Sequence, residues 1–355
     1  MLTLLPIFVI LFNFGCCDHS FDYQIADNEG HTIIDNEDKH LEYHTYSSAD
    51  VTFYLYTPTN NKTVKITPEN TYLLNMSKPT KIIIHGLGSY QDQIWIDQLV
   101  RNYHTKGDYN VIAVDWSKIS TRDTFYAVEA VNEVGEVIAQ FIMEIRGHNE
   151  EFLTDVHLIG SSLGAQVGAV AGEKIANKTN KKIDRITGLD PSDGDLKALD
   201  KDDAEFVDVI HSSLLLGEEK YGTVDFYVTG DNPSKRNCFN DSCGFVAHGL
   251  YAQTILDENR FEGVSCQNAT AYIRKLCKNN TKVVMGESVP RNASGSFYLT
   301  TDSAPGRHRL VNDVLKHELQ NGVHALSIVA KTPEQWKHSV KTVESSPNCR
   351  GGFGK

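Results

Sequence analysis

The 355-residue sequence has no long apolar segment beyond its first residues and no excess of basic charge. The apolar run at its N-terminus, from Leu2 to Phe14, is shorter than the roughly 20 residues that span a bilayer. The formal net charge of −12 argues against nucleic acid and anionic membranes as partners. No repeat, low-complexity run or glycine- and proline-rich linker divides the chain before about residue 303. The length fits one domain of about 250 to 300 residues, or two smaller ones.

The N-terminal apolar run is followed at once by polar sequence, which is the pattern of a secretory signal peptide, although no Lys or Arg precedes it. Gly15 and Cys17 are small residues two positions apart, so we predict removal of residues 1–17. Cleavage after Gly15 would instead leave Cys16 and Cys17 on the mature chain. We therefore expect a secreted, extracellular protein.

Four of the seven cysteines form two close pairs, Cys238 with Cys243 and Cys266 with Cys277, whereas Cys349 stands alone. In an oxidising compartment two short-range disulfides are the simplest arrangement, with free structural thiols as the alternative. Acceptor sequences for N-linked glycosylation agree with export. They occur at Asn61, Asn75, Asn177, Asn240, Asn268, Asn279 and Asn292.

Short apolar runs alternate with helical patterns through the middle of the chain. Runs of β-branched and apolar residues predict buried strands at residues 81–86, 110–116, 155–160, 185–190 and 206–211. Apolar residues spaced three and four apart from Ala127 to Ile145 predict an amphipathic helix, and the small residues from Ala165 to Ala176 predict another. The alternation indicates an α/β domain with a mostly parallel sheet, in which sites usually lie past the carboxyl ends of the strands.

Between a predicted strand and a predicted helix, residues 160–164 read GSSLG, which has the spacing G-x-S-x-G. In serine hydrolases this turn exposes the central serine, and the residue after the serine donates its backbone N–H to the oxyanion. Ser162 is therefore the candidate nucleophile and Leu163 a candidate oxyanion donor. The sequence HGLG at 85–88 follows an earlier strand and makes the Leu87 N–H the second donor. By itself the spacing is common, and its place between strand and helix gives it weight.

Several further segments frame this turn. In order, they are PTKIIIHGL from 79, NVIAVDW from 110, YAVEAVNEVGEVIAQFI from 126, HLIGSSLGAQVGAVAG from 157, RITGLDPSDGD from 185, DAEFVDVIHS from 203 and GTVDFY from 222. In these segments, and more weakly in VMGES and GSFYLTTD near residue 302, the sequence resembles the secreted lipases related to pancreatic lipase, including the insect phospholipase A1 branch, which have the α/β-hydrolase fold. The resemblance covers about residues 40 to 303, so we expect a lipase domain over residues 18–303 and a tail over 304–355.

The resemblance implies a catalytic triad with Ser162 as nucleophile and Asp190 as acid, although Asp190 could instead be an ordinary turn or cap residue. The family has Cys-x-His before a helix, but residues 243–252 read CGFVAHGLYA, with His248 five positions after the cysteine. Either the loop is rebuilt to present His248 as general base, which we expect, or the base is lost. A second departure is Ser161, where most relatives have histidine.

An intact triad would make the chain a secreted serine ester hydrolase that releases fatty acids from phospholipids or acylglycerols through an acyl-enzyme. The reaction requires no cofactor. The alternative is a catalytically impaired lipase-fold protein that binds or carries lipid, as yolk-protein relatives do. A peptidase would need a peptide subsite, for which the sequence gives no signal. Of these three, we expect the ester hydrolase.

No metal site is predicted. Asp195, Asp200 and Asp203 fall where relatives with bound calcium have ligands, but Ala198 occupies one neighbouring position of that pattern. Clustered surface carboxylates are more often solvated than coordinated to a metal.

The resemblance also implies a disulfide-closed lid, here Cys238 to Cys243 with only four residues between the cysteines. Within the family a lid this short goes with phospholipase A1 or mixed ester activity on lipid at a membrane or lipoprotein surface. Residues 304–355 are too few for the β-sandwich domain of larger relatives, so no colipase-type partner is expected. Within them we predict a short helix at 311–320 and disorder at 345–355.

Overall fold

The computed structural model describes residues 47–57, 63–147, 149–192, 198–212, 218–229 and 246–301. The chain divides into two units, Met1–Thr45 and Tyr46–Lys355, and all described residues belong to the second. The predicted signal peptide, the lid cysteines Cys238 and Cys243, the sequons Asn61 and Asn240, and the predicted tail lie outside the described residues. Among the described residues, none of the helices has both the length and the apolar character that a membrane span requires.

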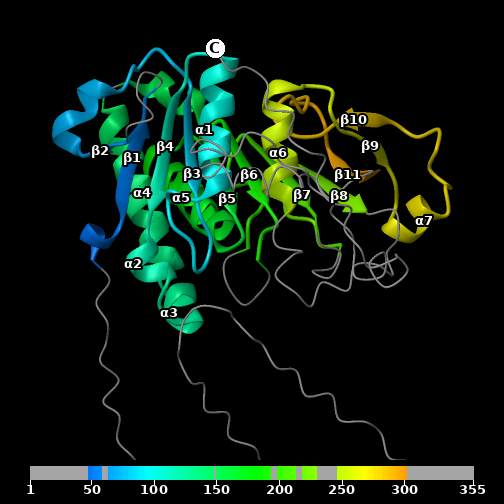
Figure 1. The fold of residues 1–355 in the computed structure, drawn as a ribbon, viewed down its shortest axis with the longest axis horizontal. Helices are drawn as coiled ribbons and strands as arrows, with labels where there is room; N and C mark the ends of the chain where they lie inside the picture. The colour runs from blue at the N-terminus through cyan, green and yellow to red at the C-terminus, as the bar shows by residue number, and fades with distance from the viewer. Residues whose placement is uncertain are drawn as a thin grey trace, which may run out of the picture. The chain divides into compact units, whose positions relative to one another are not determined.

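In the described residues, eleven strands form one sheet in the order β10-β9-β11-β8-β7-β6-β5-β3-β4-β1-β2 (Figure 1). The strands from β11 to β4 in this order run parallel, and both edges are antiparallel: β1 pairs with β4 and β2, and β9 with β11 and β10. Their bounds are β1 Thr52–Tyr56, β2 Thr63–Ile66, β3 Thr80–Ile84, β4 Asn110–Asp115, β5 Val156–Ser161, β6 Arg185–Leu189, β7 Phe206–His211, β8 Val224–Thr229, β9 Glu262–Ser265, β10 Lys282–Val284 and β11 Gly295–Thr300. The predicted mostly parallel sheet is confirmed, and the five predicted strands are β3 to β7.

Helices cover both faces of the sheet (Figure 1). One face packs against α1 (Ile94–Lys106) and α6 (Val246–Leu256), and the other against α4 (Val131–Arg146) and α5 (Leu163–Thr179). The helix predicted from Ala127 is divided, because α3 ends at Glu129 and α4 begins two residues later. The remaining helices are α2 Ser117–Ser120, α3 Thr124–Glu129, α7 Ala269–Ile273 and the 3₁₀ turns η1 Ser48–Asp50, η2 Pro68–Leu73 and η3 Glu150–Asp155. The strands are buried on both sides, which explains their continuous apolar sequences.

A buried chain of polar side chains crosses the amino ends of the central strands. Arg185 of β6 donates Nε and Nη2 to the two carboxylate oxygens of Asp208 on β7, at 2.6 and 2.8 Å. Thr187 donates to the same carboxylate at 2.9 Å and lies 2.7 Å from Nε2 of His157, whose Nδ1 lies 3.0 Å from Nζ of Lys81. Each of these five side chains has a hydrogen-bond partner, so their charges are buried together with groups that satisfy them.

Glu287, after β10, completes this polar cluster and ties both helices of one face to it. Its carboxylate accepts from Lys81 at 2.9 Å, from Tyr103 of α1 at 2.8 Å and from Tyr251 of α6 at 2.6 Å. Burial opposes ionisation of Glu287, but the charges of Lys81 and Arg185 prevail and hold its pKa at about 2. The cluster therefore anchors α1 and α6 at the end of the sheet opposite the G-x-S-x-G turn.

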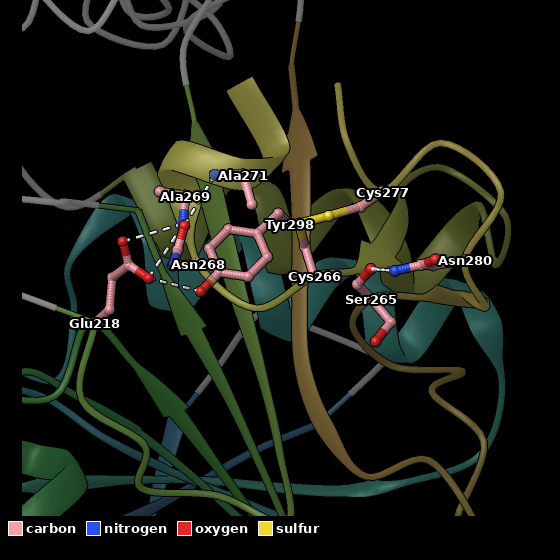
Figure 2. Close-up of a disulfide and its surroundings, with 9 residues drawn as sticks. All are labelled: Glu218, Ser265, Cys266, Asn268, Ala269, Ala271, Cys277, Asn280 and Tyr298. Carbon is pink, nitrogen blue, oxygen red and sulfur yellow. Dashed lines mark hydrogen bonds between the residues drawn. A yellow bond between two sulfur atoms is a disulfide. The ribbon is translucent and has the colours of Figure 1, made fainter. Parts of the chain in front are cut away.

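The predicted pairing of Cys266 with Cys277 is confirmed (Figure 2). The disulfide closes the segment that contains α7, beside Tyr298 of β11. Glu218 accepts from the Tyr298 hydroxyl at 2.7 Å and from the backbone N–H of Ala269 at 3.1 Å. These bonds join the segment before β8 to the disulfide-closed segment.

Candidate active site

Ser162 occupies a strained turn between β5 and α5. Its backbone dihedrals are φ 51° and ψ −123°, a conformation that residues with a side chain rarely adopt, and its N–H donates to the carbonyl of Leu189 at 3.0 Å. The side chain is partly exposed, whereas the residues on either side of it are buried. The turn therefore presents one hydroxyl at the carboxyl edge of the sheet, which is the geometry of a nucleophile elbow.

The two glycines of the motif are required by close backbone contacts. A Cβ on Gly160 would lie 2.4 Å from the carbonyl oxygen of Gly164. A Cβ on Gly164 would lie 2.4 Å from the carbonyl oxygen of Ile84 and 2.5 Å from that of His85. The spacing G-x-S-x-G is thus imposed by the packing of β5 and α5 against each other and against the end of β3.

The loop after β3 runs beside Ser162. A Cβ on Gly86 would lie 3.6 Å from the Ser162 hydroxyl oxygen, so little separates this backbone from the hydroxyl. Leu87 follows Gly86 and is 39% exposed, and Leu163 follows Ser162 as the first residue of α5. The two residues nominated as oxyanion donors therefore flank the serine on two different segments.

His85 holds this loop in place. The imidazole is fully buried, its Nδ1 donates to the carbonyl of Gly86 at 3.0 Å, and its Nε2 accepts from the N–H of Trp116 at 3.2 Å. The Trp116 indole in turn donates to the carbonyl of His85 at 2.9 Å. With both ring nitrogens engaged by backbone, His85 connects the loop to the end of β4.

Asp190 lies directly after β6 with φ 47°, one strand away from Ser162. Its carboxylate accepts the N–H of Ser212 at 2.6 Å and also the Ser212 hydroxyl, which itself accepts the N–H of Ala247 at 3.1 Å. Burial raises the pKa of Asp190, although the bonds from Ser212 oppose this rise. Ser212, which ends the segment DVIHS, thus links the acid to the start of α6.

His248 is the third residue of α6 and contacts the serine before the candidate nucleophile. Its Nε2 lies 2.5 Å from the Ser161 hydroxyl oxygen. Its ring lies flat on the indole of Trp95 from α1, with centroids 4.3 Å apart. Burial lowers the pKa of His248 to about 3, so the imidazole is neutral at physiological pH.

The structure thus brings Gly86, the residue before Leu87, beside Ser162, and it brings His248 to Ser161. Trp95 and the pairing of Ser161 with His248 were not predicted from the sequence. A signal for that pairing was present, because the family resemblance implies other residue types at position 161 and around position 248. A small residue at 161 leaves room for an imidazole that comes from α6.

The family model named Lipase matches residues 19–240, which is more than half of the chain. The chain belongs to this lipase family. A shorter match to BolA-like proteins covers residues 296–335, of which 296–301 are described and include most of β11. The α/β-hydrolase fold expected for the family is confirmed by the sheet order and the strand-turn-helix at Ser162.

The chain is similar to several curated lipases. It is 28% identical over 266 residues to pancreatic triacylglycerol lipase of Sus scrofa, which covers 64% of the chain and 58% of that protein. It is 29% identical over 248 residues to phospholipase A1 of Vespula maculifrons (64% and 82%), and 38% identical over 273 residues to lipoprotein lipase of Homo sapiens (64% and 56%). The match thus spans somewhat more than half the length of the pancreatic and lipoprotein lipases. Among solved structures, Est1E of Butyrivibrio proteoclasticus aligns with TM-score 0.30 and 13% identity over 78% of this chain and 95% of that one.

Proposed function

We propose that this protein is a serine ester hydrolase that acts on lipids, with Ser162 as nucleophile. The observation that carries the proposal is the turn itself, where a partly exposed serine at φ 51° stands between two glycines that tolerate no Cβ. Strain of this kind is retained where function requires it. Membership of the lipase family supports an ester as substrate.

In the proposed reaction, the Ser162 oxygen attacks the ester carbonyl carbon while Nε2 of His248 takes the hydroxyl proton. The N–H groups of Leu163 and Leu87 stabilise the oxyanion of the tetrahedral intermediate. Its collapse expels the alcohol, which receives the proton from His248, and leaves an acyl-enzyme. Water activated by His248 then releases the fatty acid and restores Ser162.

Asp190 has the role of the acid in this scheme. Its carboxylate is bound to Ser212, and Ser212 is bound to Ala247, the residue immediately before His248. The acid is thereby connected to the helix that carries the base. Stabilisation of the imidazolium by a nearby carboxylate is the ordinary contribution of the third triad member.

For the substrate we propose phospholipids first, with acylglycerols as secondary substrates, and for the location the extracellular space. Only four residues separate Cys238 from Cys243 in the sequence, and the Vespula maculifrons relative is named a phospholipase A1. Extracellular location is supported by the apolar N-terminus and by sequons on exposed residues, which are Asn75, Asn177, Asn279 and Asn292.

The test is fatty-acid release from sn-1-labelled phosphatidylcholine and from triolein, measured for the secreted protein and its Ser162→Ala variant. We expect release from phosphatidylcholine that disappears in the variant, together with loss of covalent labelling by a fluorophosphonate probe. A higher rate on triolein would overturn the substrate preference. If both proteins bind lipid vesicles equally and neither releases fatty acid, the function is lipid binding instead.

A further inference from the structure

Ser161 and His248 form a buried pair directly beside the proposed nucleophile. Ser161 is the last residue of β5 and is only 3% exposed. Ile159, two positions earlier on the same strand, packs in the apolar cluster that contains the buried residues of α6, so Ser161 faces the same helix. From that helix His248 brings Nε2 to 2.5 Å from the hydroxyl oxygen.

The direction of this hydrogen bond follows from what the hydroxyl can reach. Within the described residues, His248 Nε2 is the one hydrogen-bond partner of the Ser161 side chain. A buried hydroxyl proton without an acceptor is costly, so the hydroxyl donates and Nε2 accepts. The neutral imidazole must then carry its proton on Nδ1.

Trp95 fixes the plane of the ring that accepts this bond. The indole and the imidazole are 9° from parallel, and the indole N–H is itself held by the side chain of Gln93 at 2.9 Å. The stacking prevents the ring from tilting, and the Ser161 hydroxyl sets which nitrogen faces β5. Together they hold the plane of the ring and engage its Nε2.

We propose that Ser161 is a positioning residue of the catalytic site, whose hydroxyl donates to Nε2 of His248 and so keeps the lone pair of that nitrogen at the serine turn. The role rests on the proposed function, in which the same lone pair accepts the proton of Ser162. When substrate binds, the Ser161 bond to Nε2 is exchanged for one from the adjacent Ser162 hydroxyl. A general base needs this tautomer, because the opposite one has no lone pair on Nε2.

The first experiment reads the tautomer without any need for activity. Protein labelled with ¹⁵N-histidine is examined by NMR in the Ser162→Ala background, with the His248 signals assigned from a His248→Gln variant. We expect a protonated Nδ1 and an unprotonated, hydrogen-bonded Nε2. Adding Ser161→Ala should give a mixture of the two tautomers, and adding Ser161→Thr instead should restore the single tautomer with the proton on Nδ1. The matched control is Ser296→Ala, which removes a buried strand serine on β11.

The second experiment measures kcat and KM for fatty-acid release with Ser162 intact. Ser161→Ala should lower kcat about tenfold with little change in KM, since His248 is retained but part of it has the tautomer without a lone pair on Nε2. Ser161→Thr should recover most of the rate. An unchanged tautomer in Ser161→Ala, or a higher kcat, would overturn the inference; a higher kcat would mean that Ser161 holds the base away from Ser162. The unmodified protein could release no fatty acid while Ser161→Ala still changes the tautomer in the NMR experiment. In that case the proposed function fails, and the hydrogen-bond assignment stands.

Discussion

The indole of Trp95 and the imidazole of His248 lie face to face, with centroids 4.3 Å apart and planes 9° from parallel. The contact joins α1 to α6 near the serine turn. Three residues further along α6, the hydroxyl of Tyr251 lies 2.9 Å from that of Tyr103, in the last turns of α1, and both hydroxyls reach Glu287. The histidine thus stands on a helix that is fixed at two points.

Replacing Trp95 should affect the rate of hydrolysis more than the fold. Loss of the stacking in Trp95→Ala frees the ring of His248, and an aromatic pair contributes about 0.5–1.5 kcal/mol. We therefore expect kcat to fall between about twofold and tenfold, with a smaller fall in Trp95→Phe, which can still stack. Steady-state kinetics on phosphatidylcholine would show this. Equal losses in both variants would mean that stacking is not the cause.

Alanine at Gly164 should disrupt the turn, whereas alanine at Gly168 on the same helix should not. A Cβ at 164 would meet two carbonyl oxygens at 2.4 and 2.5 Å, but at 168 the nearest atom is the terminal methyl of Ile84 at 3.6 Å. We expect Gly164→Ala to destabilise by about 3 kcal/mol. Gly168→Ala should be neutral or stabilise by about 0.5–1 kcal/mol. Urea unfolding of both variants tests the contrast, which similar midpoints would contradict.

Ser162→Gly should abolish hydrolysis and stabilise the fold. Glycine adopts φ 51° without the strain that serine bears, so relief of about 1 kcal/mol is expected. The measurement is the unfolding midpoint in urea. Ser296→Gly on β11, at a position without positive φ, should instead lose stability. A lower midpoint for Ser162→Gly would show that the turn is not strained.

Glu287→Gln should destabilise the protein and alter its response to acid. The variant leaves Lys81 and Arg185 with one buried carboxylate fewer, at a cost of about 3 kcal/mol. Because the folded pKa of Glu287 is about 2 against 4.5 ordinarily, its contribution is complete above pH 4.5 and is lost as the pH falls towards 2.

Urea unfolding between pH 2 and 7 measures both effects. The stability of the unmodified protein should fall more steeply below pH 4.5 than that of Glu287→Gln. The control is Glu262→Gln, whose exposed pair with Lys282 at 2.7 Å should contribute less than about 1 kcal/mol. Parallel pH profiles for the unmodified protein and Glu287→Gln would contradict the assignment.

The central strands and the serine turn could be predicted because their signals are local. A continuous apolar run followed by glycine, and G-x-S-x-G before small residues, depend on neighbours within a few positions. The partner of His248 could not be predicted in this way. It depends on where α6 lies over β5, and that is set by contacts of Tyr251 and Asn102 with residues more than 30 positions away. The divided helix at Ala130 was missed because both parts continue one apolar pattern.

The late position of Glu287 in the sequence limits the order in which parts of the protein can fold during synthesis. The carboxylate that meets Lys81 is made 206 residues later, which at roughly 5–20 residues per second is on the order of 10 to 40 s of synthesis. Until then Lys81 lacks the carboxylate that it meets in the folded protein, and Arg185 has only that of Asp208. Neither Tyr103 nor Tyr251 has the carboxylate acceptor that fixes its helix. The nascent chain can therefore form its central strands early, but final docking of the helix that carries His248 waits for the translation of residue 287.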